Sequence, residues 1–288
     1  MGRAAGRTWR FALVGSGIGP SLSPALHERE AALLGLDHSY VRWDLDELGL
    51  PPAAIGDLLR RAREEGLDGL NVTHPCKQLV LPHLSGLTAD ACALGAVNTV
   101  VLGPDGAVGH NTDWSGFARS LDRGLPAAPR GHVVLVGAGG AGAAVAHALL
   151  VAGTRRLTVV DADPGRARAL ALATGERFAH QRVVTVPQAG LPAALGTADG
   201  VVNATPTGMA AHPGVPVDVA LLPAGAWVAD VVYRPLETAL VRAARAAGHR
   251  VLDGGGMAVF QAAQSFEVFT GLVPDVPRML RHFADLVA

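Results

Sequence analysis

The chain contains little cysteine and almost no net charge. Its 288 residues include two cysteines, Cys76 and Cys92, and the formal net charge at pH 7 is -1. Two cysteines cannot form a disulfide framework, and these two are too far apart for a Cys-x-x-Cys pair, so a reducing compartment, the cytoplasm, is expected. A charge so close to zero also lacks the basic footprint of nucleic-acid-binding proteins. We therefore expect a small-molecule partner and no nucleic acid.

Long uninterrupted apolar runs are also scarce. The chain starts with the basic segment "MGRAAGRTWR", but the apolar run that follows, "FALVGSGIGP", is broken by glycine and proline, so no export signal is expected. Residues 133–153 are uncharged and as long as a membrane span. Their glycines and turn motif instead predict a buried strand, a tight turn and a buried helix. We expect no membrane segment.

Short apolar strands alternate with helical segments along the chain. The first hundred residues contain the strand-like segments "FALVG", "HSYVRWD", "GLNVT" and "AVNTVVL", with "SPALHEREAALLG" and "IGDLLRRAREEG" as helices. A Pro/Gly-rich stretch at residues 123–131 indicates a domain change nearby, and strands then recur as "RLTVVDAD", "RVVTV", "GVVNATP", "AWVADVVY" and "RVLDG". This alternation predicts an α/β fold with a parallel, doubly wound sheet in the second region.

A glycine-rich turn lies between an expected strand and an expected helix in "VVLVGAGGAG". Gly137, Gly139 and Gly142 have the spacing G-x-G-x-x-G. In that pattern the first glycine allows a tight turn, the second lets the backbone approach a pyrophosphate, and the third allows close helix packing. The phosphates would meet backbone N–H groups at the positive end of the helix dipole. The segment therefore predicts a dinucleotide site.

An aspartate ends the next expected strand, in "VVDADPGRARAL". Asp161 lies 19 positions after Gly142 (161 minus 142), where the dinucleotide-binding pattern places a carboxylate on the adenosine ribose hydroxyls. A 2′-phosphate there would meet a like charge, so NAD is favoured over NADP. Asp161 could instead cap the following helix, although Asp163 suits that role better. Arg166 and Arg168 keep the NADP alternative open, because a guanidinium can bind a phosphate.

Two polar segments before the glycine turn carry candidates for chemistry. In "GLNVTHPCK", Lys77 follows a strand and a proline turn, and in "GHNTDWSG", Asp113 stands just before an expected helix. Taken alone, each has a simpler explanation: Lys77 as a solvated side chain and Asp113 as a helix N-cap. Their assignment to chemistry depends on the rest of the chain.

Eight segments occur in the order found in the shikimate/quinate dehydrogenase family, which the sequence resembles over nearly its whole length. They are "SLSPALH", "GLNVTHPCK", "LGAVNTVV", "GHNTDWSGF", "VGAGGAG", "VVNATPTGM", "VVYRPLETAL" and "GGGMAVFQAAQSFEVFTG". The patterns N-V-T-x-P-x-K and N-T-D-x-x-G are the most distinctive. The resemblance implies oxidation of a ring hydroxyl on a cyclic hydroxy-carboxylate, with hydride transfer to a nicotinamide cofactor, and the reverse reaction.

The resemblance also implies roles for individual residues. Lys77 matches the family's catalytic lysine, which exchanges a proton with the substrate hydroxyl, and Asp113 matches its partner aspartate. The positions that bind the ring hydroxyls and the carboxylate correspond to Ser21, Ser23, Thr73, Asn98, Tyr233 and Gln261. The positions of the cofactor site correspond to Gly137, Ala138, Gly139, Gly140, Ala141, Gly142, Asp161, Arg166, Asn203, Thr205, Met209, Val231, Gly254 and Met257. No metal is implied.

The implied architecture is an α/β fold of two domains. Residues 1–112 and 255–288 would form a substrate-binding domain, completed by the C-terminal helices, and residues 113–254 a Rossmann-type NAD-binding domain with a doubly wound parallel sheet. The sequence does not determine the oligomeric state, and a homodimer is one assembly compatible with it.

Some residues depart from the common family pattern. Asp161-Ala162-Asp163 replaces the N-R-T-like residues of many NADP-using members, "GSGIGP" replaces the commoner loop, and Glu28 replaces a frequent asparagine. The acidic replacement resembles the NAD-preferring quinate/shikimate branch, and Ser23, where that branch has threonine for quinate use, favours shikimate. The alternatives are a dehydrogenase of amino-shikimate or amino-quinate analogues and a non-catalytic, dinucleotide-binding regulatory homologue.

Overall fold

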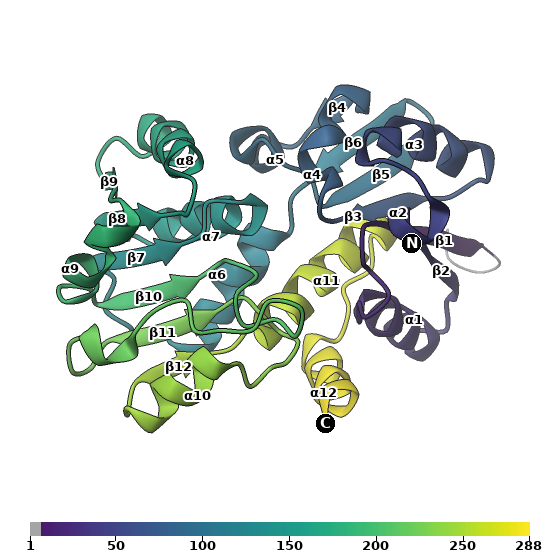
Figure 1. Ribbon diagram of the computed structural model, residues 1–288. Coiled ribbons are helices and arrows are strands. Elements are labelled where there is room, and N and C mark those ends of the chain that lie inside the picture. Colours follow the sequence, from purple (N-terminus) through teal and green to yellow (C-terminus); the bar gives the residue numbers. More distant parts are fainter. Residues whose placement is uncertain (1–6) are drawn as a thin grey trace. The chain divides into compact units, whose positions relative to one another are not determined.

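Two six-stranded sheets, each in its own compact unit, form the framework of the protein (Figure 1). The computed structural model describes residues 7–288, so most of the basic start of the chain, residues 1–6, lies outside the described part. Unit 1 consists of the described residues up to Thr112 together with Gln261–Leu286, and unit 2 consists of Asp113–Phe260. The fold is therefore α/β with two units, as the sequence predicted.

The sheet of unit 1 combines parallel and antiparallel strands in the order β2-β1-β3-β5-β6-β4. β1 is parallel to β2 and β3, whereas β5 runs antiparallel to both β3 and β6. The strands are β1 (Thr8–Gly15), β2 (Asp37–Asp44), β3 (Gly69–Val72), β4 (Gly86–Leu87), β5 (Thr99–Gly103) and β6 (Gly106–His110). The sequence did not predict β4 and β6, because each is short and Gly86, Gly106 and Gly109 weaken any strand pattern.

Helices cover this sheet because its interior strand β1 is apolar on both faces. In β1, Ala12 and Val14 pack in one hydrophobic cluster with α3, while Phe11 and Leu13 pack in another with Phe269. The helices of unit 1 are α1 (Ser23–Leu33), α2 (Leu45–Leu48), η1 (Pro52–Ala54), α3 (Ile55–Glu64), α4 (Cys76–Leu79), η2 (Leu81–His83), α5 (Ala89–Leu94) and α12 (Val276–Val287).

Unit 2 has six parallel strands in the order β12-β11-β10-β7-β8-β9. This is the doubly wound Rossmann order, in which the chain starts at the middle of the sheet and builds outward in both directions. The strands are β7 (His132–Val136), β8 (Arg156–Val160), β9 (Arg182–Thr185), β10 (Gly200–Asn203), β11 (Trp227–Asp230) and β12 (Arg250–Leu252). The predicted doubly wound sheet is confirmed.

Both faces of this sheet are covered by helices, as alternate residues of β7 show. Val133 and Leu135 pack in a cluster with α6, α7 and α8, whereas Val134 and Val136 pack in a cluster with α9 and α10. A fully buried parallel strand explains why "HVVLV" is apolar throughout. The helices are α6 (Asp113–Gly124), α7 (Gly140–Val151), α8 (Pro164–Arg177), η3 (Gln188–Gly190), α9 (Leu191–Leu195), η4 (Val219–Leu221) and α10 (Ala239–Ala246).

The connections between the units differ in character. The chain passes from unit 1 to unit 2 between Thr112 and Asp113, and it returns within α11 (Gly255–Thr270), at Phe260. Residues 125–131, most of the Pro/Gly-rich stretch, connect α6 to β7 inside unit 2. No helix in residues 7–288 is both long enough and apolar enough to span a bilayer.

Candidate active site

Strand order brings four loops to one edge of the sheet in unit 1. β1 and β3 are parallel, so the loops that follow them leave the sheet at the same edge. β5 is antiparallel to β3, with Thr99 opposite Asn71, so the residues before β5 lie at that edge too. β6 is antiparallel to β5, with His110 opposite Thr99, which adds the residues after β6. Segments around positions 16–22, 73–77, 98 and 111–112 therefore meet although the sequence separates them.

The loop between β1 and α1 carries Ser21 and Ser23. The Ser23 N–H donates to Ser21 Oγ at 3.3 Å, and the Ser21 N–H donates to the Ile18 carbonyl at 2.9 Å. The N–H groups of Gly17 and Ile18 donate to the carboxylate of Asp44, at 3.0 and 2.8 Å. These two bonds to a buried carboxylate fix the start of the loop that carries both serines.

The turn between β3 and α4 carries Thr73 and Lys77. The Thr73 N–H donates to the Val14 carbonyl at 2.9 Å, and the Lys77 carbonyl accepts from the Val97 N–H, also at 2.9 Å. A Cβ atom on Gly15 would lie 2.4 Å from the Thr73 side chain, so only glycine allows the two loops to approach this closely. The serine loop and the lysine turn are thus packed together.

Asn98 is held by the segment that leads into α6. Its Oδ1 accepts hydrogen bonds from the Thr112 N–H at 2.8 Å and from Thr99 Oγ1 at 3.1 Å. Its Nδ2 donates to Thr112 Oγ1 at 2.9 Å, and Thr112 Oγ1 in turn donates to the Gln261 carbonyl at 3.1 Å. These bonds join the start of β5, the end of unit 1 and helix α11, and they fix which way the Asn98 amide faces.

Asp113 and Tyr233 belong to unit 2. Asp113 is the first residue of α6, is buried, and follows Thr112 directly in the chain. Tyr233 follows β11 and is half-buried. Ser21, Ser23, Thr73, Lys77, Asn98 and Gln261 are in unit 1.

The glycine turn of unit 2 has the close contacts that its spacing predicted. Gly137 has a φ of +103°, in the left-handed region, and an added Cβ would lie 2.7 Å from the Ala204 carbonyl oxygen. A Cβ on Gly142 would lie 2.1 Å from the Gly137 carbonyl oxygen, whereas one on Gly139 would meet nothing within 4 Å. Gly137 and Gly142 are thus required by packing, and Gly139 borders open space at the N-terminus of α7, which fits a pyrophosphate.

Asp161 connects the end of β8 to this turn. Its Oδ2 accepts from the Ala138 N–H at 2.7 Å, and its Oδ1 accepts from the Asp163 N–H at 2.8 Å. Arg166 Nη2 lies 3.5 Å from Asp161 Oδ1, and the Arg166 side chain is 60% exposed. The N-cap of α8 is Asp163, whose side chain accepts from the Gly165 N–H at 2.8 Å. Asp161 is therefore not the helix cap, and its carboxylate lies beside the glycine turn.

Asn203, at the end of β10, is part of a buried polar network. Its Nδ2 donates to Asp230 Oδ1 at 2.9 Å and to the Thr207 carbonyl at 3.0 Å, and its Oδ1 accepts from Thr205 Oγ1 at 2.7 Å. Asp230 also accepts from Thr238 Oγ1 at 2.7 Å. Burial raises the pKa of Asp230, and its hydrogen bonds, of which that from Thr238 is the largest influence, act against this rise. The network fixes the backbone at the ends of β10 and β11.

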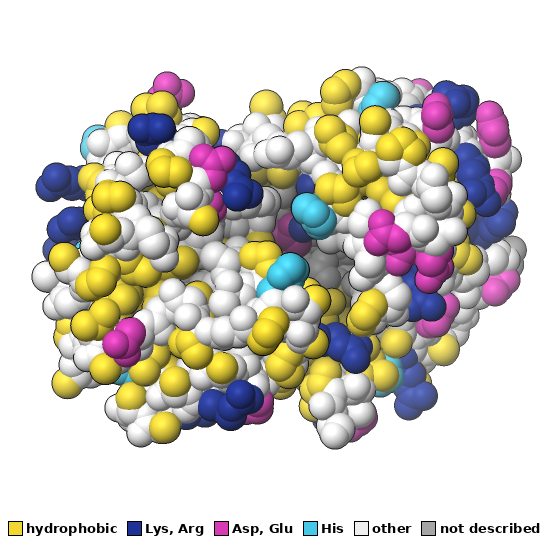
Figure 2. Space-filling view, in the orientation of Figure 1, with side chains coloured by type: hydrophobic (Ala, Val, Ile, Leu, Met, Phe, Trp, Pro, Cys, Tyr) yellow, Lys and Arg dark blue, Asp and Glu magenta, His cyan; other side chains and the backbone are white. Residues whose placement is uncertain are grey.

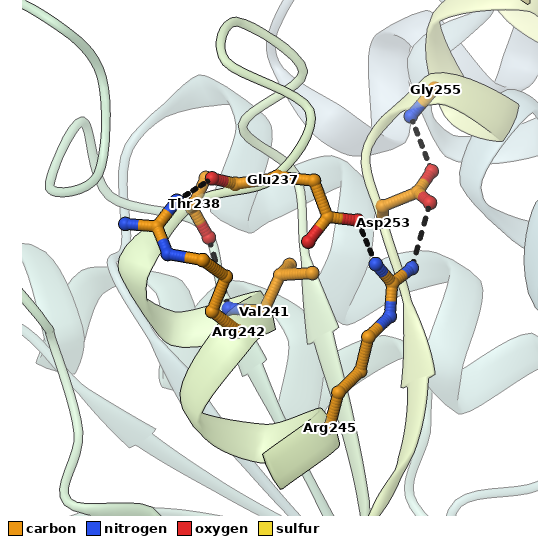
Figure 3. Close-up of polar contacts among 7 residues, drawn as sticks. All are labelled: Glu237, Thr238, Val241, Arg242, Arg245, Asp253 and Gly255. Carbon is orange, nitrogen blue, oxygen red and sulfur yellow. Dashed lines mark hydrogen bonds and ion pairs between the residues drawn. The ribbon is translucent and has the colours of Figure 1, made fainter.

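A chain of charged side chains orders the segment between β12 and α11 (Figure 3). Arg245 pairs with Glu237 and, at 3.6 Å, with Asp253, and Asp253 Oδ1 accepts from the Gly255 N–H at 3.1 Å. A Cβ on Gly254 would lie 2.5 Å from the Val231 carbonyl oxygen. The turn before α11 therefore packs on the end of β11.

The other residues predicted for the cofactor site are placed as follows. Ala138 and Gly139 lie in the turn after β7, and Gly140 and Ala141 begin α7. Thr205 follows β10, and Met209, in the same loop, is 42% exposed. Met257 is in α11 and packs against the core of unit 2.

The sequence-based prediction missed Asp44 and Asp230. Each is a buried aspartate at the end of a parallel strand, and each accepts several hydrogen bonds from loops that carry predicted site residues. Asp161 was found because its distance from the glycine turn is diagnostic. The same signal, an acidic residue where an apolar strand ends, is present in "YVRWD" and "AWVAD", but it has no spacing rule to support it.

Charges on the molecular surface are mixed. On the face drawn in Figure 2, Lys and Arg side chains alternate with Asp and Glu, and the described residues show no broad field of one sign there.

The parallel sheet, the glycine turn and the carboxylate beside it define unit 2 as a dinucleotide-binding domain of the dehydrogenase class. Comparison with known proteins narrows this class. Residues 13–100 match the family model described as the shikimate dehydrogenase substrate binding domain. A shikimate dehydrogenase (NADP(+)) of Streptomyces avermitilis is 61% identical over 274 residues, which cover 95% of this chain and 94% of the relative.

A quinate/shikimate dehydrogenase (NAD(+)) of Corynebacterium efficiens is 49% identical over 275 residues, 95% of this chain and 97% of the relative. Among solved structures, the quinate dehydrogenase of Corynebacterium glutamicum in complex with NAD has a TM-score of 0.91 at 46% identity, with 96% of this chain and 99% of that chain covered. The chain belongs to the shikimate dehydrogenase family. Its relatives are dehydrogenases, which confirms the predicted class of enzyme, an oxidoreductase acting on a CH–OH group.

Proposed function

We propose that this protein is an NAD-preferring shikimate dehydrogenase. It would interconvert shikimate and 3-dehydroshikimate, with quinate and 3-dehydroquinate as further substrates, in the cytoplasm. The observation that supports this reaction most directly is the position of Lys77, at the sheet edge where the serine loop, the lysine turn and Asn98 meet. The relatives named above act in the same reaction class, which supports the assignment.

Lys77 is proposed to exchange a proton with the reacting hydroxyl. It is the only lysine in the chain, among 24 lysine and arginine residues. Arginine stays protonated at any physiological pH, so it can supply charge but cannot act as a proton acceptor. Lysine can release its proton and arginine cannot, so a lysine at this one position, in a chain whose other cationic side chains are arginine, fits a proton-transfer role.

The remaining polar residues are proposed to hold the substrate. The hydroxyls of Ser21 and Ser23 would bind the ring carboxylate, because two donors on one ordered loop suit its two oxygens. Asn98, Asp113, Thr73, Tyr233 and Gln261 would bind the ring hydroxyls and carboxylate, with Asp113 beside the reacting hydroxyl. Positioning of this kind brings the reacting carbon into line with the hydride acceptor.

The bound dinucleotide would supply the hydride acceptor. Gly137 to Gly142 would hold its pyrophosphate at the N-terminus of α7, and Asp161 would accept hydrogen bonds from the adenosine ribose. Thr205, Met209, Val231, Gly254 and Met257 would line the nicotinamide side, where the Asn203 network keeps the backbone in place. These residues fit the cofactor because the turn leaves open space at Gly139 and a carboxylate beside it.

NAD is the proposed cofactor because of the Asp161 carboxylate. A ribose 2′-phosphate in contact with it would meet a fixed negative charge held by two backbone N–H groups. The second candidate is an NADP-dependent shikimate dehydrogenase. It is favoured by the 61% identity with a relative named for NADP and by Arg166, whose exposed guanidinium lies 3.5 Å from Asp161 and could turn toward a phosphate.

A steady-state matrix tests the substrate and the cofactor together. Shikimate, quinate and their amino analogues are each oxidised with NAD and with NADP, and kcat/KM is compared. We expect shikimate with NAD to have the largest value. A larger kcat/KM with NADP would establish the second candidate. A larger kcat/KM for an amino analogue would make that analogue, and not shikimate, the preferred substrate. No turnover with any pair would indicate a non-catalytic homologue.

The single lysine allows a direct test of the chemistry. Reductive methylation of the folded protein can modify only Lys77 and the chain's terminal amine, and mass spectrometry locates the label. We expect turnover to fall in proportion to Lys77 modification, with protection by shikimate. Lys77→Arg should keep the charge and NAD binding but lower kcat about 10²- to 10⁴-fold, as expected when a proton-transfer group is lost. Full turnover of either protein would remove Lys77 from the mechanism.

A further inference from the structure

Helix α11 places one buried hydroxyl among three separate parts of unit 1. Ser265 is fully buried, and its Oγ lies 3.1 Å from Asn71 Nδ2, 2.9 Å from Thr99 Oγ1 and 3.1 Å from Thr112 Oγ1. Asn71 is in β3, Thr99 begins β5 and Thr112 precedes α6. A serine inside a helix usually turns to solvent or bonds the carbonyl four residues back. Here that carbonyl, of Gln261, accepts from Thr112 instead.

Each hydroxyl has a single hydrogen to donate, and this limits how the hydroxyl groups of the network can be oriented. Thr99 Oγ1 donates to Asn98 Oδ1, and Thr112 Oγ1 donates to the Gln261 carbonyl, so each hydroxyl has used its single hydrogen. With those two hydrogens used, Ser265 is left to donate to Thr99 or to Thr112, and its Oγ and Thr99 Oγ1 are both within hydrogen-bond distance of the Asn71 amide nitrogen, at 3.1 and 3.0 Å. Tyr40 completes the arrangement by donating to Asn71 Oδ1 at 2.7 Å.

The network converges on Asn98. Two of the three residues that Ser265 contacts, Thr99 and Thr112, also hold the Asn98 amide. If that amide turned over, its NH₂ would face the Thr112 N–H, and two donors would meet. The Thr112 N–H thus sets which way the Asn98 amide faces, and the two hydroxyls that Ser265 contacts hold the amide in that orientation.

We infer that Ser265 is a positioning residue for substrate binding, acting through Thr99 and Thr112 on the Asn98 amide. This inference rests on the proposed function, in which Asn98 binds a ring hydroxyl. Ser265 itself does not touch the substrate. Its loss should weaken binding and turnover of the ring substrate and leave the cofactor parameters unchanged, because its contacts all lie within unit 1.

The test compares Ser265→Ala with the control Thr174→Val. Thr174 is equally buried, but its hydroxyl donates to the Leu170 carbonyl within its own helix, α8, at 2.7 Å. We expect Ser265→Ala to lower kcat/KM for shikimate about tenfold, or ~1.4 kcal/mol, through KM, with the KM for NAD unchanged. Thr174→Val should lower the melting temperature without altering either KM. If Ser265→Ala instead lowers kcat with both substrates at saturation and leaves the KM for shikimate and the KM for NAD unchanged, its role is merely structural and the inference is overturned.

A double-mutant cycle with Asn98→Ala makes the test specific. Shikimate binding without cofactor is measured by calorimetry in the wild type, both single variants and the double variant. If Ser265 acts through Asn98, Ser265→Ala should have no further effect in the Asn98→Ala background, whereas additive effects would refute the coupling. If Ser265→Ala does not fold, Ser265→Cys, a near isostere with a weaker S–H donor, replaces it, and an unchanged KM would then overturn the inference.

Failure of the inference and failure of the proposed function give different results. A wild-type protein that oxidises shikimate while Ser265→Ala behaves identically refutes the positioning role alone. A wild-type protein that neither binds nor oxidises any of the ring substrates refutes the proposed function, and the positioning role with it.

Discussion

Replacing Asp161 by asparagine should change the cofactor preference of this enzyme. The carboxylate is largely shielded, with 8% of its side chain exposed, and Arg166 lies 3.5 Å away. Two unit charges about 4 Å apart interact by about 1 kcal/mol in water and about 4 kcal/mol at the effective dielectric of a protein surface. A ribose phosphate carries about -1.5 to -2 charges, and Arg166 offsets one of them. We therefore expect a net penalty against NADP of about 1 to 4 kcal/mol.

That penalty corresponds to about a 5- to 1,000-fold discrimination in kcat/KM. Asp161→Asn removes the charge, keeps the volume and leaves Arg166 without this partner, so the NADP to NAD ratio should rise by about 10- to 100-fold. The amide keeps one acceptor for the Ala138 or Asp163 N–H but not both, so stability should fall by about 1 to 3 kcal/mol.

The assay is the initial rate of shikimate oxidation with each cofactor, followed by the absorbance of the reduced nicotinamide. Asp163→Asn is the matched control, because Asp163 contacts the same arginine at 3.6 Å but is 54% exposed. Asparagine also remains a good N-cap for α8. The control should leave the ratio within about twofold. An unchanged ratio in Asp161→Asn, together with lower stability, would show that this carboxylate only braces the glycine turn and would refute the electrostatic argument.

Three further predictions concern the glycine turn, a buried ion pair and the response to acid. Gly139→Ala should leave stability unchanged, because its Cβ meets nothing within 4 Å. It should raise the KM for NAD about tenfold by occupying the space proposed for the pyrophosphate. Glu30→Gln should lower the free energy of unfolding by about 3 kcal/mol, measured by urea titration, because Glu30 is 1% exposed and accepts from Arg278 Nε and Nη2 at 2.9 and 2.7 Å. Burial lowers the pKa of His27 to about 3 and that of His38 to about 4, so stability should be complete above the unfolded value near 6.5 and fall below it, by about 1.4 kcal/mol per pH unit for each histidine.

Each of these has a control and a contradicting result. Gly142→Ala should disrupt folding, because its Cβ would lie 2.1 Å from a carbonyl oxygen; an unaltered KM for NAD in Gly139→Ala would remove the pyrophosphate from that space. Asp57→Asn breaks an ion pair that is exposed on both sides and should cost less than about 1 kcal/mol. A Glu30→Gln loss no larger than this would contradict the role assigned to the buried Glu30 carboxylate. Stability that stays constant from pH 6.5 to 4 would contradict the neutral state assigned to the histidines.

Much of unit 2 could be predicted because its signals are local. The glycine turn, the apolar strand before it and the aspartate after the next strand lie within about thirty positions of one another. Backbone sterics at Gly137 and Gly142 and the common edge of parallel strands determine the rest. The same reasoning correctly assigned the cap of α8 to Asp163 rather than Asp161.

The α/β class, the parallel sheet of unit 2 and the chemical types of the candidate site residues therefore follow from local sequence patterns. The contacts that hold these residues in place depend on long-range packing. Ser265 meets Thr99 across 166 positions and Asn71 across 194, and Glu30 meets Arg278 across 248. Asp44 accepts a hydrogen bond from the serine loop, and the antiparallel pairing of β5 with β6 brings Asn98 and Thr112 together. Such partners are selected when apolar faces pack and buried polar groups must find hydrogen bonds, and no pattern within one segment encodes that choice.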